Sequence, residues 1–102
     1  MLSDPEASRS QDATRSYSHD ATAAANLLVA HGFNTEAESA YDVARQLWPG
    51  SPDVAADLSE LYQRTGRGAE ARQLLEDFAR QFPDQRKTLK ELWGISVGEA
   101  EP

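Results

Sequence analysis

Apolar residues recur along the chain at spacings of three and four, as on one face of a helix, and nowhere alternate as in a strand. This pattern predicts five helices, over about residues 18–31, 35–48, 52–65, 69–82 and 85–93. The residues expected on their buried faces are, helix by helix, Ala21, Ala24, Ala25 and Leu28; Ala37, Ala40, Tyr41, Ala44 and Leu47; Val54, Ala55, Leu58, Leu61 and Tyr62; Ala71, Leu74, Leu75 and Phe78; and Leu89, Leu92 and Trp93. We therefore expect an all-α fold in which each helix buries one apolar stripe.

Glycine, proline and small polar residues mark the ends of these helices. Gly32, Gly66 and Gly94 stand where the first, third and fifth helices should stop, because glycine adopts the left-handed conformation of a helix end at little cost. Pro49 and Pro83 end the second and fourth helices. The residues expected to cap the helix starts are Ser18, Asn34, Ser51 and Asp84.

The first two helix pairs carry the same residue types at a constant offset of 34 residues. The matching pairs are Ala21 and Ala55, Gly32 and Gly66, Glu36 and Glu70, Ala37 and Ala71, and Pro49 and Pro83. A fixed period of this length is typical of a helix–turn–helix repeat. We place the two repeats at about 18–51 and 52–85, inside a domain that spans residues 18–94.

The two ends of the chain lack this pattern. Residues 1–17 are mostly Ser, Asp, Arg, Gln, Thr and Glu, a composition that favours a disordered leader or a linker from an upstream domain. Residues 95–102 are expected to form a flexible acidic tail, in which Ile95 folds back onto the end of the last helix.

Composition and charge narrow the classes of partner. The chain has 102 residues and a net charge of −7, which repels phosphate, so we expect neither nucleic acid nor a membrane as partner. It has no cysteine, which removes disulfides and cysteine zinc sites, and no apolar run approaches the roughly 20 residues of a membrane span. With no secretory signal either, we expect a cytoplasmic protein.

The repeat resembles the tetratricopeptide repeat family, whose signature places small residues where helices cross, a large apolar residue in the second helix and a proline after it. The matching residues of the first repeat are Ala25, Gly32, Ala37, Tyr41, Ala44 and Pro49, and those of the second are Ser59, Gly66, Ala71, Leu75, Phe78 and Pro83. Ala21 and Ala55 replace the usual tryptophan, and Phe78 replaces a small residue. The resemblance implies an α-α superhelix, with the helix at about 85–93 as its cap.

The resemblance also implies that the first helix of each pair lines a concave groove for a peptide or protein partner. The groove residues it implies are Asn26, Asp53, Asp57, Glu60, Arg64 and Lys87. Some family members grip a terminal carboxylate with a five-residue clamp, and here Asn26 and Lys87 match that clamp. Thr22, Asp57 and Glu91 stand where the clamp has lysine, asparagine and arginine. The two acids Asp57 and Glu91 disfavour an anion in the clamp. In the middle of the groove, Asp53, Asp57 and Glu60 favour a basic or amide-rich peptide, unless they are an ordinary solvated face.

The sequence carries no pattern typical of catalysis. No nucleophile–base pairing, glycine-rich phosphate loop or metal-ligand cluster stands out, so we expect no enzyme activity, cofactor or metal. The first hypothesis is a scaffold or adaptor that docks a peptide or protein. The second is a structural or self-associating end of a longer repeat array, which leaves a homo-oligomer open. The third is the regulatory end of a larger protein.

Overall fold

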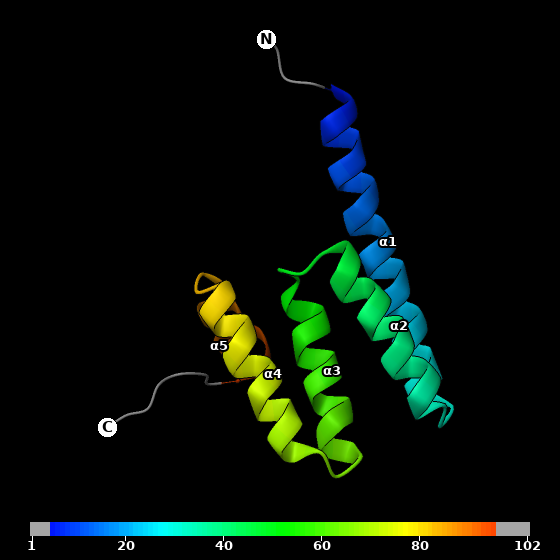
Figure 1. The fold of residues 1–102 in the computed structure, drawn as a ribbon, viewed down its shortest axis with the longest axis vertical. Helices are drawn as coiled ribbons and strands as arrows, with labels where there is room; N and C mark the ends of the chain where they lie inside the picture. The colour runs from blue at the N-terminus through cyan, green and yellow to red at the C-terminus, as the bar shows by residue number, and fades with distance from the viewer. Residues whose placement is uncertain (1–4, 96–102) are drawn as a thin grey trace. The chain divides into compact units, whose positions relative to one another are not determined.

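The computed structural model describes residues 5–95, and the side chains of residues 12–95. Its helices are α1 (Pro5–Ala30), α2 (Asn34–Leu47), α3 (Pro52–Arg64), α4 (Gly68–Gln81) and α5 (Gln85–Trp93), shown in Figure 1. None of the described residues lies in a strand, so the predicted all-α fold with five helices is confirmed. The acidic tail predicted after Ile95 lies outside the described residues.

The first helix is longer than its apolar pattern predicts. It begins at Pro5, whereas we expected a helix start near Ser18 and a disordered segment before it. Residues 6–17 contain neither glycine nor proline, so nothing in them stops a helix, and proline is favoured at a first helical position. Ser18 therefore lies inside α1 and does not cap it.

The other helix starts also differ in detail from the capping prediction. Asn34 is the first residue of α2 and Phe33 holds the cap position, whereas Ser51 precedes α3 with Pro52 as its first residue, as expected. Among the described starts of α2 to α5, no side chain caps the backbone with a hydrogen bond. The start of each helix is therefore set by where the preceding turn ends rather than by a capping side chain.

The three glycine stops are confirmed. Gly32, Gly66 and Gly94 have φ angles of 84°, 78° and 69°, in the left-handed region where a side chain would be strained. After α1 the Phe33 amide donates to the Leu28 carbonyl at 2.8 Å, and after α3 the Arg67 amide donates to the Tyr62 carbonyl at 2.7 Å. The two repeats therefore turn between their helices in the same way.

The chain divides into two compact units, residues 1–49 and 50–102. In the first unit α1 packs against α2, and the buried residues of α2 are the predicted Ala37, Tyr41 and Ala44. Ala25 of α1, Ala37 and Ala44 are all fully buried. Such small side chains let the two helix backbones approach closely, so this pair packs with little side-chain bulk between its helices.

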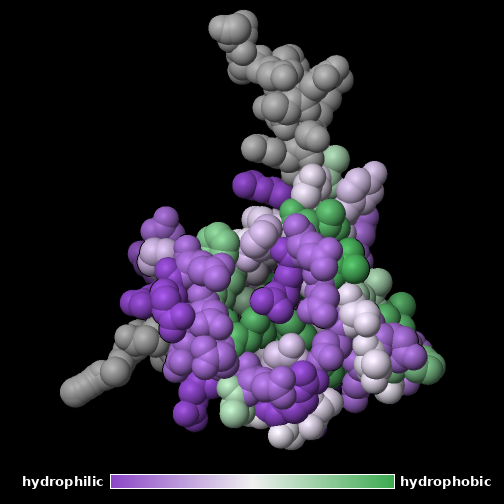
Figure 2. Space-filling model, viewed as in Figure 1, coloured by the Kyte–Doolittle hydropathy of each residue, from purple (hydrophilic) through white to green (hydrophobic). Residues whose placement is uncertain are grey.

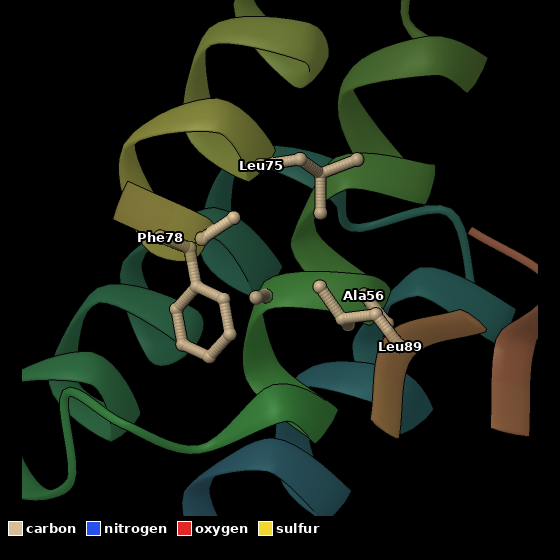
Figure 3. Packing of buried hydrophobic residues seen from close by; sticks show 6 residues of the cluster. Ala56, Leu75, Phe78 and Leu89 are labelled. Carbon is tan, nitrogen blue, oxygen red and sulfur yellow. The ribbon is translucent and has the colours of Figure 1, made fainter. Parts of the chain in front are cut away.

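In the second unit α3 packs against both α4 and α5. Leu75 and Phe78 extend from α4, Leu89 from α5 and Ala56 from α3 into one cluster, shown in Figure 3. Phe82, Trp93 and Ile95 pack against this cluster, and the Ile95 amide donates to the Leu89 carbonyl at 3.1 Å. The predicted return of Ile95 onto the end of the last helix is confirmed.

Two residues predicted on buried faces are exposed. Ala24 lies on the outside of α1, and Leu92 of α5 is 69% exposed. Among the residues of α1 whose side chains the structure describes, those that are buried are Ser18, Thr22 and Ala25, a stripe rotated away from the predicted one. Polar residues hold two positions of this stripe, which is why the search for apolar residues at helical spacing missed it.

Candidate interaction surfaces

One face of α3 gathers most of the predicted groove residues. Asp53, Asp57, Glu60 and Arg64 follow one another at steps of four, three and four, so they share a face of the helix. Asp53 and Asp57 are half-buried, Glu60 and Arg64 are exposed, and the Arg64 guanidinium contacts the Glu60 carboxylate at 3.3 Å. Three carboxylates and one guanidinium make this face acidic. Hydrophilic residues also cover the outer surface of α4 in the same unit (Figure 2).

The remaining two groove residues lie on other helices. Lys87 is exposed on α5, where its ammonium stands 3.9 Å from the Glu91 carboxylate. Asn26 lies on α1 in the first unit, and its side-chain carbonyl accepts a hydrogen bond from the Tyr41 hydroxyl of α2. Asn26 thus has a structural role in joining the helices of the first repeat, and its part in a shared groove stays a prediction.

The clamp position at Thr22 is a packing position. Thr22 is buried, and its hydroxyl donates to the Ser18 carbonyl at 2.8 Å. Ser18 is buried beside it, and its hydroxyl crosses to α2 and donates to the Ala44 carbonyl at 2.9 Å. The sequence offers no signal for this bond, because its two partners lie 26 residues apart. A residue committed to this packing does not present its hydroxyl to a ligand.

A stacked ion pair closes the turn between α3 and α4. The Arg67 guanidinium lies 4.2 Å from the centre of the Tyr62 ring and contacts both carboxylate oxygens of Glu70, at 2.7 and 2.9 Å. These hydrogen bonds from Arg67 hold the pKa of the Glu70 carboxyl below its usual 4.5. The pair is exposed and supports the turn, so we assign it to the fold rather than to a binding site.

In the first unit, the single tryptophan lies against two residues of α1. Trp48 follows the end of α2, and the Arg15 guanidinium stands 4.9 Å from the centre of its ring. His19 meets the same ring edge-on, with the ring centres 5.8 Å apart. These contacts join the part of α1 around residues 15–19 to the end of α2, which supports the interpretation of Trp48 as a packing residue.

Among the residues that the structure describes, no group of three or more His, Cys, Asp or Glu could hold a metal ion. In that part of the chain, no helix has both the length and the apolar character needed to cross a bilayer.

Two helical hairpins with the same glycine turn define this as a helical-repeat protein. Comparison with protein families identifies the repeat, since the model of the tetratricopeptide repeat matches residues 28–92. The chain belongs to the tetratricopeptide repeat family, whose members are generally non-catalytic protein–protein interaction modules. No curated protein and no solved structure matched the chain.

Proposed function

We propose that this protein docks a basic peptide or a basic segment of a partner protein on the acidic face of α3. The observation that carries the proposal is the run Asp53, Asp57 and Glu60, which puts three carboxylates on one face of a helix. Val54, Leu58 and Leu61, one position after each of these acids on the neighbouring face of α3, are buried. Lysine or arginine side chains of a partner would complement the charge of this face.

The family supports this choice of helix, because its members present the first helix of each repeat to their ligands. The resemblance also implies groove roles for Arg64 and Lys87 in the second unit and for Asn26 in the first unit. Charge attraction would select basic peptides over acidic ones, although it would not supply all of the affinity. Because salt screens charges, we expect the binding to weaken as salt is added. The protein then acts as an adaptor or scaffold.

An array of peptides that differ only in charge tests the proposal. Wild-type protein should bind peptides rich in lysine and arginine and ignore acidic peptides of the same length. The double substitution Asp57→Lys, Glu60→Lys should remove that binding, measured by calorimetric titration. A pull-down from lysate with the same two proteins would then identify the natural partner.

A matched control separates the α3 face from overall charge. The double substitution Glu36→Lys, Glu76→Lys changes the net charge by the same amount on exposed positions of α2 and α4. If both double variants lose binding equally, the attraction is nonspecific and the α3 face is not the site. If wild type binds no peptide of either charge, the proposal fails.

Self-association is the second candidate function, and a separate observation favours it. Tyr17 and Leu27 of α1 are 62% and 61% exposed, although large apolar residues usually lie inside a small domain. A repeat protein whose outer helix face is apolar must cover that face with another repeat or another chain. We infer that α1 carries this contact, either as the end of a longer array or between copies.

A further inference from the structure

The outer side of α1 carries a continuous stripe of exposed residues at helical spacing. We call it the outer stripe; its members, at steps of four and three, are Ala13, Tyr17, Asp20, Ala24 and Leu27 on α1 and His31, which directly follows the end of the helix. Asp20 is its only carboxylate, and every member is exposed. The exposed side of α4, by contrast, carries charges at Glu70, Arg72, Glu76 and Arg80. A helix face that stays in water usually carries several charges, as that of α4 does. The low charge of the outer stripe therefore favours contact with protein.

The second repeat buries the residues that correspond to this stripe. The residues 34 positions after Tyr17, Asp20, Ala24 and Leu27 are Ser51, Val54, Leu58 and Leu61. In the second repeat these four positions are only 3%, 1%, 0% and 3% exposed. The tetratricopeptide register therefore uses these positions for packing, and α1 presents the same register with its residues open.

We propose that the outer stripe binds the outer stripe of a second copy of this chain, with the two α1 helices antiparallel about a two-fold axis between Ala24 and Leu27. In this register Leu27 packs over the partner's Ala24, and Ala24 receives the partner's Leu27. Asp20 then lies opposite the partner's His31, and the symmetric pair forms at the other end. A two-fold contact needs a surface that complements itself, and here large meets small and acid meets imidazole.

The choice of a second copy rests on this self-complementarity. The alanines of the stripe let two helices approach closely, while Leu27 supplies the apolar area for burial. A partner with no donor or positive charge opposite Asp20 would leave that carboxylate without a complementary group. This inference deepens the self-association proposed above and does not depend on peptide binding by α3.

Sedimentation velocity over a series of concentrations tests the contact. Wild-type protein should show a reversible monomer–dimer equilibrium. The substitution Leu27→Lys should weaken the dimer by roughly tenfold or more, which corresponds to about 1.4 kcal/mol of lost association energy. Leu92→Lys is the matched control, because Leu92 is the same residue type, is 69% exposed and lies on α5. Both residues are exposed, so circular dichroism should show the same helix content in all three proteins.

A charge reversal tests the register. Asp20→Lys should weaken the dimer, and Asp20→Lys combined with His31→Glu should restore it. His31 follows Asp20 by 11 residues in the sequence, or about 16 Å along a helix axis, so the two side chains of one chain cannot pair. Rescue by the second substitution must therefore come from contact between chains.

Each outcome separates this inference from the broader proposal of self-association. A protein that stays monomeric at every concentration overturns both. A dimer that survives Leu27→Lys, or that Leu92→Lys weakens as much, keeps self-association but places it on another surface. A dimer that Leu27→Lys breaks but the charge reversal does not rescue overturns the antiparallel register.

Discussion

The two repeats share a frame and a turn but fill their interiors in different ways. The first repeat joins its helices through small residues and a buried hydroxyl, with Ala25, Ala37 and Ala44 fully buried and Ser18 bonded to the Ala44 carbonyl. In the second repeat, Phe78 occupies the position that corresponds to Ala44, and it packs in a cluster with Leu75 and Leu89. One register of 34 residues therefore accepts either close helix contact or bulky packing with a third helix.

This difference shows which part of the repeat is constrained. The glycine turns at Gly32 and Gly66 are the same in both repeats, because only the left-handed conformation reverses the chain there. The interior positions vary because each is adjusted to its own neighbours. Tyr41, which is buried and bonds Asn26, corresponds to Leu75, whose side chain has no polar atom.

Phe78 and Ala44 occupy the same position of the two repeats, and giving each repeat the other's residue should destabilise both. We expect Phe78→Ala to lower the free energy of unfolding by about 3–5 kcal/mol, because it empties the centre of the second cluster. Ala44→Phe should cost about 1–3 kcal/mol or more, because a ring does not fit between α1 and α2. Urea unfolding of each variant measures both. If Ala44→Phe were neutral, close approach would not be what holds the first repeat.

Ala24 and Leu58 occupy the same position of the two repeats, and substitution there should change stability in the second repeat only. Leu58 is fully buried, so Leu58→Ala should cost about 2–5 kcal/mol. Ala24 corresponds to it in α1 but is exposed, so Ala24→Leu should change the stability of the monomer by about 0.5 kcal/mol or less. Thermal unfolding at low protein concentration compares the two. Equal sensitivity would show that the outer side of α1 is covered within a single chain.

The buried hydroxyl should matter in the first repeat alone. Ser18→Ala removes the donor to the Ala44 carbonyl, and we expect a loss of about 1 kcal/mol. The control is Ser39→Ala, since Ser39 is exposed on α2 and should tolerate the change. Denaturant midpoints of the two variants give the comparison. Alanine has the higher helix propensity, so Ser39→Ala should not lower stability, and a loss as large as that of Ser18→Ala would show that the buried bond is not the cause.

The smallest expected effect is the dependence of stability on pH at the second turn. Because Arg67 lowers the pKa of Glu70 in the folded state, the pair adds stability above the unfolded value near 4.5. That contribution is lost as the pH falls through the lower folded pKa. Glu70→Gln should therefore melt below wild type at neutral pH, and the difference should shrink as the pH falls through the lowered folded pKa and the wild-type carboxyl becomes protonated.

Glu36→Gln is the control in the first repeat. Glu36 lies in the first turn of α2 as Glu70 does in α4, so both substitutions remove the same favourable interaction with a helix start. The residue that corresponds to Arg67 is Phe33. We expect Glu36→Gln to show the smaller change in melting temperature with pH. An equal change in both variants would assign the effect to the helix ends rather than to Arg67.

The sequence by itself determined the number of helices, their turns and the repeat frame. These features are local, because glycine and proline act on their own backbone and because helical spacing assigns residues to a common face. The acidic face of α3 was also predictable, since Asp53, Asp57 and Glu60 need only one helix to come together.

Only the tertiary structure decided which face of α1 is buried and how far the helix extends. Ser18 and Thr22 are polar, and their burial depends on acceptors: a carbonyl on α2 for Ser18 and one a turn away for Thr22. Spacing fixes which residues share a face but not which face meets another helix, so Ala24 and Leu92 were wrongly expected inside. Burial is a property of packing between distant segments, and the sequence of one helix does not contain it.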